Sequence, residues 1–307
     1  MRHKIGRDVG LSVRMLGTMV LLAILYLAFI AVLFKLGVPL AFVIVIAAVL
    51  LIAQYYFSDR MVLASIGARE VSEQEAPELH DLVSRLAQMT AMPKPKVAVI
   101  DSPVPNALAT GRNPKHALVA VTTGILQALE PQELEAVLAH EMSHVIHRDT
   151  RVMAMASFFA TVASFIVQAE LWGGMYGGWG GGGYGYGGGG RGNNRGNSFI
   201  LVFLVSAVVW AVSFVLIQTL SRYRELAADR GSALITGQPS TLASALVKIS
   251  GRMQRIPSQD LRQVEAANAL MIFPAVTRGS IAELFSTHPS LEHRLARLQK
   301  MESELSR

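Results

Sequence analysis

The chain contains no cysteine and few charged side chains, and each absence removes a class of protein. Without cysteine there can be no disulfide, thiolate zinc finger, iron–sulfur cluster or cysteine nucleophile. Any metal must therefore be held by His, Asp or Glu. Charged residues make up only 16% of the 307 residues and hydrophobic residues make up 51%, a balance that does not suit a soluble surface. The composition predicts an integral membrane protein.

Four apolar stretches without a charged side chain are long enough to approach or cross a membrane, whose hydrocarbon core is about 30 Å thick. They cover residues 15–34, 36–57, 152–169 and 198–221. The third stretch, with 18 residues, also fits a buried core helix. If all four stretches cross the bilayer, the chain forms two transmembrane hairpins.

The basic residues predict how these hairpins are oriented. Four of them precede the first apolar stretch: Arg2, Lys4, Arg7 and Arg14. We interpret that stretch as an uncleaved anchor with its N-terminus in the cytoplasm. An even number of crossings then returns the chain to the cytoplasm for residues 58–151 and 222–307. The formal net charge of +6 is modest and fits this orientation, so no nucleic-acid partner is expected.

Residues 172–197 separate the third and fourth stretches and hold 15 of the 26 glycines. Such a segment cannot bury enough apolar surface to offset its backbone entropy, so we expect a loop outside the membrane.

The predicted domains follow from the order of the apolar stretches and the polar regions between them. Residues 1–57 form the basic N-terminus and first hairpin, and 152–221 form the second hairpin with its loop. Residues 58–151 and 222–307 form the two parts of a catalytic domain.

The polar regions show short helical and strand patterns. Residues 79–90 have helical periodicity, whereas 95–101 and 117–122 contain the short apolar, β-branched runs typical of strands. Glu130 and Pro131 then open a further helix, because proline is tolerated in a first turn and good helix formers follow it. This helix contains the candidate catalytic residues.

His140, Glu141 and His144 form an H-E-x-x-H pattern within this helix. Residues four apart lie on one helical face, about 6 Å apart along the axis, so both imidazoles can bind one Zn²⁺ at about 2.1 Å. Glu141 is offset toward the open coordination position and would act there as a general base toward water. Histidines on a helix are also often merely solvated, so the prediction depends on a third ligand.

His147 is the nearest further histidine, but it lies about 10 Å along the axis from His140, too far for a shared tetrahedral zinc. Glu225 follows the fourth apolar stretch and would project from the same membrane face as the histidines if the two apolar helices run antiparallel. Asp229, one turn further, would accept a hydrogen bond from the outer ring N–H of a zinc-bound histidine. The alternative for both carboxylates is a solvated helix end paired with nearby arginines.

Four motifs follow one another along the chain. They are N-A-x-A-T-G at 106–111, H-E-x-x-H at 140–144, R-x-x-E-x-x-A-D at 222–229 and T-H-P-S-x-E-x-R at 287–294. In this order they resemble the motifs of the membrane zinc peptidases of the HtpX type, gluzincin-type relatives of the zinc CAAX prenyl proteases. The resemblance covers nearly the whole chain, whereas the glycine-rich loop is longer than in the stress-induced enterobacterial member.

The resemblance implies one Zn²⁺ per chain, held by His140, His144 and Glu225, and it implies that Glu141 is the base and proton shuttle. The implied fold is an α-helical integral membrane protein with four transmembrane helices and a discontinuous α+β, zincin-like cytoplasmic catalytic domain. Three further residues match positions that line the cleft in the family: Asn106, His288 and Arg294. Peptide hydrolysis needs a donor for the oxyanion beyond the metal, and we assign that catalytic role to His288.

Substrate binding is expected at an exposed edge of the strand before the H-E-x-x-H helix. The residues of this strand are Ala117, Leu118, Val119, Ala120 and Val121. Pairing of an extended peptide with a strand edge supplies affinity through main-chain hydrogen bonds and gives little sequence preference. The same residues are equally consistent with a plain core strand.

These patterns predict a zinc metalloendopeptidase of the plasma (inner) membrane that hydrolyses misfolded or damaged membrane and membrane-associated proteins in quality control and stress response. The alternatives are a processing protease for lipidated or specific peptides and a non-catalytic membrane scaffold. The intact ligand set argues against the scaffold, and the number of apolar stretches argues against the larger chamber of the processing enzymes. The expected partners are polypeptide substrates, the lipid bilayer, and quality-control proteins or a second copy of the chain.

The predicted topology can be tested with single cysteines, because the chain has none of its own. Gly183→Cys should react with a membrane-impermeant thiol reagent in intact cells, since the glycine-rich loop is expected outside. Ser258→Cys should react only after lysis. Labelling of position 258 in intact cells would show that a membrane crossing has been miscounted.

Overall fold

The computed structural model divides the chain into two compact units, each made of separate segments. The first contains residues 1–15, 56–153 and 218–307, and the second contains 16–55 and 154–217. The residues that the structure describes are 9–36, 67–111, 113–149, 152–158, 160–164, 194–253 and 288–306, with a few isolated positions besides. The first unit carries the H-E-x-x-H helix.

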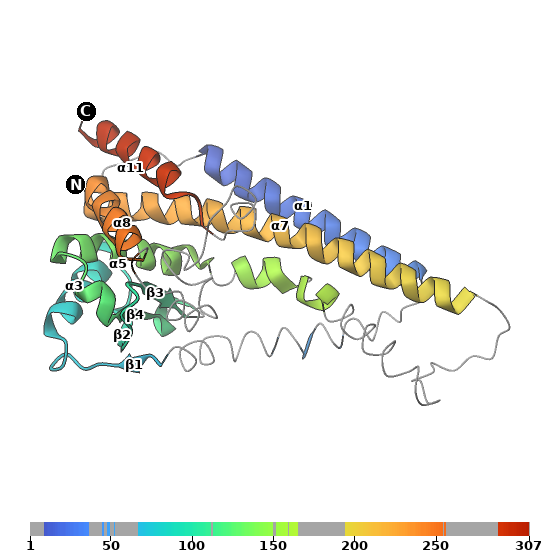
Figure 1. The fold of residues 1–307 in the computed structure, drawn as a ribbon, viewed down its shortest axis with the longest axis horizontal. Coiled ribbons are helices and arrows are strands. Elements are labelled where there is room, and N and C mark those ends of the chain that lie inside the picture. The colour runs from blue at the N-terminus through green and yellow to red at the C-terminus, as the bar shows by residue number, and fades with distance from the viewer. Residues whose placement is uncertain are drawn as a thin grey trace. The chain divides into compact units, whose positions relative to one another are not determined.

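The first unit contains a four-stranded sheet in the order β1-β2-β4-β3 (Figure 1). The strands are β1 (Arg69–Glu70), β2 (Lys96–Ile100), β3 (Ala107–Thr110) and β4 (Leu118–Thr122). β2 and β4 run parallel, whereas β1 and β3 are antiparallel to their neighbours. The sheet confirms the two strands expected from the sequence and adds β1 and β3.

Helices cover one face of this sheet, where Val97, Val119 and Val121 point into the main core. The helices of the first unit are α3 (Pro77–Thr90), α4 (Thr123–Leu126), α5 (Pro131–His147), α8 (Pro239–Met253) and α11 (Leu291–Leu305), with a short 3-10 turn at Pro114–His116. Val97, Val119 and Val121 pack with α3, α5 and α8 in the main core, and Ala98 and Ala120 face a smaller apolar cluster on the other side.

The expected exposed strand edge at Ala117, Leu118, Val119, Ala120 and Val121 is wrong. β4 is paired with β2 on one side and with β3 on the other, so its backbone groups are used within the sheet. All five residues of β4 are buried, as is typical of an interior strand with two apolar faces. Among the described strands, β3 is the outer one on this side, and it lies against α5.

The helix α7 (Asn194–Thr236) is one uninterrupted helix that begins in the second unit and continues into the first. Glu225 and Asp229 therefore lie on the same helix as the fourth apolar stretch, in fixed register with it. Gly231 of α7 meets Ser143 of α5, and an added Cβ there would lie 2.7 Å from the Ser143 Cβ. Ser232 also donates its hydroxyl to the Ala136 carbonyl of α5 at 2.7 Å. The two helices thus cross at van der Waals contact.

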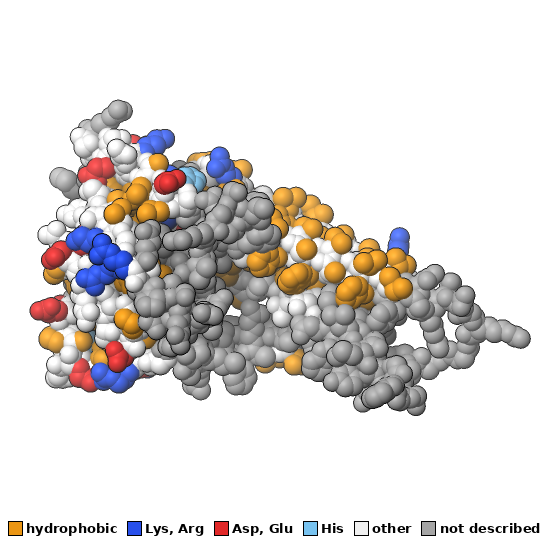
Figure 2. All heavy atoms as spheres, viewed as in Figure 1, with side chains coloured by type: hydrophobic (Ala, Val, Ile, Leu, Met, Phe, Trp, Pro, Cys, Tyr) orange, Lys and Arg blue, Asp and Glu red, His pale blue; other side chains and the backbone are white. Residues whose placement is uncertain are grey.

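In the second unit, large apolar side chains of α1 (Val9–Lys35) and α7 face outward (Figure 2). Among the described residues, α1 and the 200–236 part of α7 are the helices long and apolar enough to cross a membrane. Leu27 is 68% exposed and Val208 is 60% exposed, which a soluble core helix would not allow but lipid contact does. A third apolar helix, Val152–Ser164, is shorter.

Three sequence predictions fall wholly or partly outside the described residues. They are the second apolar stretch at 36–57, the end of the third stretch beyond 164, and the glycine-rich segment 172–197 up to the start of α7. The predicted helix at 79–90 and the helix opened by Glu130 and Pro131 are confirmed as α3 and α5.

Gly231→Ala should push α7 away from α5 and lower the free energy of unfolding by about 1–3 kcal/mol, as overpacking does. The thermal unfolding midpoint of the detergent-purified protein should fall by several degrees. Gly251→Ala is the matched control, because nothing lies within 4 Å of an added Cβ at that exposed helical position. Ser143→Gly combined with Gly231→Ala should recover part of the loss. Unchanged stability of Gly231→Ala would contradict the close crossing.

Candidate metal centre

The helix α5 is held firmly at its start, where its own side chains satisfy the free backbone groups. The Glu130 N–H donates to the Glu133 carboxylate at 3.0 Å, half of a capping box, and Pro131 occupies the first turn. Glu133 also accepts from Ser244 at 2.6 Å and from Lys248 at 2.8 Å, both on α8. These contacts fix the register of the two histidines that follow.

His140 and His144 face the same side of α5, with ring centroids 4.9 Å apart and planes at 87°. Glu225 from α7 lies opposite them, and one ligand atom of each residue lies within 4.8 Å of the others. The Nε2 atoms of His140 and His144 are 3.5 Å and 3.4 Å from the Glu225 carboxylate. Ligand atoms about 3.4 Å apart are the spacing of a tetrahedral zinc with bonds of about 2.1 Å.

The polar atoms at the middle of this cluster support a metal there. His140 Nε2 and Glu225 Oε2 are buried and have no hydrogen-bond partner within the described part of the chain. Buried polar atoms rarely stay unpaired, because losing their hydration costs free energy. Two imidazoles and a carboxylate that converge without hydrogen-bonding one another are therefore a fitting donor set for a metal ion. His147 lies outside the cluster and contacts Ser143 Oγ at 3.2 Å.

The outer nitrogen of each histidine faces a buried aspartate. His140 Nδ1 lies 3.0 Å from Asp229 Oδ1, the position that the sequence analysis expected. Arg294 donates to both oxygens of Asp229, at 2.9 Å and 2.6 Å. Although burial lowers the pKa of His140, the neighbouring Asp229 and Glu225 carboxylates outweigh it and raise that pKa.

Asp149 is a functional candidate that the sequence analysis missed. Its Oδ2 lies 2.6 Å from His144 Nδ1 and 3.1 Å from Arg224 Nε. Burial raises the pKa of the Asp149 carboxyl, but His144 and Arg224 outweigh it, so the pKa is lowered and the group is ionised. The only sequence signal is an acidic residue directly after the predicted helix end. Helical spacing cannot show that it folds back onto His144.

Glu141 lies beside the donor set without belonging to it. Its Oε2 accepts from the Ala109 N–H of β3 at 2.9 Å, so this N–H points away from β4. Burial raises the pKa of Glu141 above its ordinary value, and the positive charges of His140 and His144 only partly oppose this. A carboxylate with a raised pKa accepts a proton more readily than an ordinary one, as a general base must.

The three remaining site residues are placed around this group. His288 Nδ1 lies 3.1 Å from Glu225 Oε2, so His288 reaches the centre. Arg294 is only 1% exposed, and its guanidinium is directed at Asp229. Asn106 is buried just before β3, where its backbone pairs with Thr122. A substrate contact of Asn106 or Arg294 stays a prediction.

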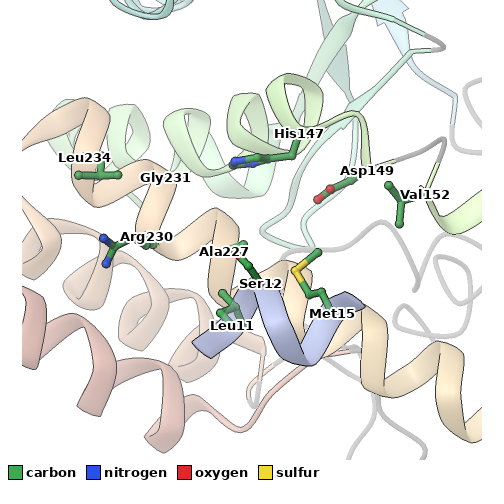
Figure 3. A pocket seen from close by; sticks show the side chains of 10 residues that line it. All are labelled: Leu11, Ser12, Met15, His147, Asp149, Val152, Ala227, Arg230, Gly231 and Leu234. Carbon is green, nitrogen blue, oxygen red and sulfur yellow. The ribbon is translucent and has the colours of Figure 1, made fainter. Parts of the chain in front are cut away.

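A cavity of about 430 Å³ lies next to the end of α5 (Figure 3). Its walls include His147 and Asp149, Ala227 and Gly231 of α7, and Leu11 of α1. None of the three metal-ligand candidates is among its described lining residues, although Asp149, which lines it, contacts His144.

An H-E-x-x-H helix that meets a glutamate from a second helix, in a chain with exposed apolar helices, defines a membrane metallopeptidase. Residues 73–302 match the model of peptidase family M48, and the chain belongs to this family. It is 59% identical to a protease HtpX homolog of Moorella thermoacetica over 306 residues, 99% of each chain. It is 54% identical to protease HtpX homolog 2 of Methanosarcina acetivorans over 100% of both.

The fold is also similar to a solved structure, Ste24p of S. mikatae. The TM-score is 0.55 at 17% sequence identity, and the match covers 95% of this chain and 67% of that one. At this identity the likeness concerns the fold alone. The family and the relatives together make the chain a metalloendopeptidase of the membrane.

Glu225→Ala should lower the metal content of the purified protein as severely as His144→Ala, because each removes one of three ligand candidates. Asp229→Ala should weaken metal affinity only by about 10- to 100-fold, since it acts through the orientation of His140. His147→Ala is the control and should keep the metal. Elemental analysis of the detergent-purified variants measures their metal content. The ligand set would be wrong if His147→Ala lost the metal while Glu225→Ala kept it.

Proposed function

We propose that this metalloprotease is a zinc endopeptidase that hydrolyses peptide bonds in misfolded or damaged membrane and membrane-associated proteins. The observation that carries the proposal is the convergence of His140 Nε2 and His144 Nε2 on the Glu225 carboxylate, at 3.5 Å and 3.4 Å. Two histidines and one glutamate are a common donor set of catalytic zinc sites. One Zn²⁺ per chain would be held by these three side chains.

A bound zinc supplies Lewis acidity, which makes water easier to deprotonate and the peptide carbonyl more electrophilic. Glu141 accepts and returns the proton during hydrolysis. With its Oε2 held by the Ala109 N–H at 2.9 Å, its Oε1 can take the proton of the attacking water. The raised pKa of Glu141 suits the return of that proton to the leaving amine.

His288 is the proposed donor to the oxyanion. Its Nδ1 lies within 3.1 Å of a Glu225 oxygen, so the ring borders the place where a substrate carbonyl would meet the ligands. An N–H aimed at a developing negative charge stabilises the transition state more than the ground state. Asn106 and Arg294 remain proposed substrate-side residues, of which Arg294 is committed to Asp229 through two hydrogen bonds.

The outer edge of β3 is the place where an extended peptide would align. Among the described strands β3 lies at this edge of the sheet, and its Ala109 N–H points away from β4 to Glu141, so this edge borders the catalytic base. Main-chain pairing there would bind unfolded segments with little sequence preference, as quality control requires. This assignment replaces the interior strand β4.

The proposed topology has four transmembrane helices, with 58–151 and 222–307 forming one zincin-like domain in the cytoplasm. The hairpins are 1–57, with its basic N-terminus, and 152–221. The two apolar helices α1 and α7 support this arrangement, as does the basic N-terminus. The proposed location is the plasma (inner) membrane, with quality-control proteins or a second copy of the chain as further partners.

Glu141→Gln should keep the zinc and lose turnover by about 10²- to 10⁴-fold, because the amide cannot accept the water's proton. The measurement is zinc analysis of the detergent-purified variant beside cleavage of casein, an unfolded polypeptide, with and without a chelator. Arg85→Gln is the control, since Arg85 contacts Glu135 on the exposed surface and should change neither quantity. Cleavage at the native rate by zinc-loaded Glu141→Gln would contradict the proposed role of Glu141 as the base.

A further inference from the structure

The two histidines of the centre are held by matching but separate contacts. His140 Nδ1 faces Asp229 at 3.0 Å, and Asp229 is bound by Arg294. His144 Nδ1 faces Asp149 at 2.6 Å, and Asp149 is paired with Arg224 at 3.1 Å. Asp229 lies on α7, four residues from Glu225. Asp149 lies outside α5 and α7, directly after the turn residue Arg148 that ends α5, and is itself helical.

We propose that Asp149 is the positioning residue for His144, and that the left-handed turn at Arg148 together with Arg224 determines the metal affinity of the site. The proposal rests on the metal centre of the proposed function. It assigns to Asp149 a role in holding one ligand, not in touching substrate.

The chain geometry at the end of α5 explains why Asp149 reaches His144. Arg148 has φ 56° and ψ 40°, and its N–H donates to the carbonyls of His144 and Val145. This left-handed cap ends the helix and turns the chain back, so that the next residue lies beside a side chain one turn earlier. A non-glycine residue holds such a backbone only at some cost, about 1 kcal/mol or more. The left-handed turn at Arg148 therefore places the Asp149 carboxylate beside His144.

Arg224 contacts the same carboxylate oxygen, Asp149 Oδ2, at 3.1 Å. It lies on α7 one residue before Glu225, so the helix that supplies the third ligand also fixes the partner of His144. Asp149 is buried although it lines the cavity beside the end of α5 (Figure 3). A buried carboxylate between an imidazole and a guanidinium has little freedom to turn. His144 is therefore presented with Nε2 toward Glu225.

The first experiment measures Zn²⁺ affinity by competition with a chelating dye, on the full-length detergent-purified protein. Asp149→Ala should weaken the affinity by about 10- to 100-fold, the usual effect of removing the partner of a ligand histidine. Asp149→Asn keeps an acceptor without the charge and should lie between the native protein and Asp149→Ala. The absorption spectrum of the Co²⁺-loaded protein should change in both variants, because the His144 ring is reoriented.

A matched pair at position 148 tests the turn without touching the carboxylate. Arg148→Gly and Arg148→Val remove the same exposed charge, but only glycine adopts positive φ without cost. Arg148→Gly should bind Zn²⁺ within about twofold of the native protein, whereas the β-branched Arg148→Val should bind several-fold more weakly. Arg224→Gln should also weaken binding, by less than Asp149→Ala.

Circular dichroism of each variant separates this effect from loss of fold. If Asp149→Ala does not fold, Asp149→Asn and the position 148 pair decide the question. Native zinc affinity and an unchanged Co²⁺ spectrum in folded Asp149→Ala or Asp149→Asn would overturn the proposal, as would equal affinities for Arg148→Gly and Arg148→Val. Failure of the metal centre itself is distinguishable, because His144→Ala and Glu225→Ala would then also bind zinc normally.

Discussion

The close crossing of α5 and α7 is the constraint on which the catalytic unit depends. Glu225 comes within 3.5 Å of both histidine Nε2 atoms only because the two helix backbones nearly touch at Gly231 and Ser143. Two small residues permit that approach, and interior packing leaves little room to restore it by other means. The chemistry of the site therefore depends on the absence of one side chain on α7.

Buried charge is the second feature of this unit, and it is balanced locally. Asp229 and Arg294 are almost fully buried and form two hydrogen bonds, which offsets part of the cost of removing both from water. Asp149 and Arg224 form a second ion pair, through a single contact of 3.1 Å, beside the other histidine. Because each aspartate has its own arginine, each can stay ionised and orient an imidazole whose inner nitrogen remains available to a metal.

Two residues of the metal centre and its surroundings are close in sequence to apolar segments. Asp149 precedes the apolar helix Val152–Ser164, and Glu225 follows the apolar part of α7 within one continuous helix. Of the three ligand candidates, Glu225 lies on a helix whose apolar part is long enough to cross a membrane, whereas His140 and His144 lie on α5.

The sequence by itself determined the membrane class, the helix α5, the strands β2 and β4 and the pairing of His140 and His144, because helical and strand periods are local. It also indicated Glu225 and Asp229 through spacing from apolar stretches. It could not decide which strand edge is free, since apolar residues look alike in interior and edge strands. Only the tertiary structure decided that β3 is an outer strand among those described and that Asp149 reaches His144, because both follow from chain reversals whose end points no local pattern encodes.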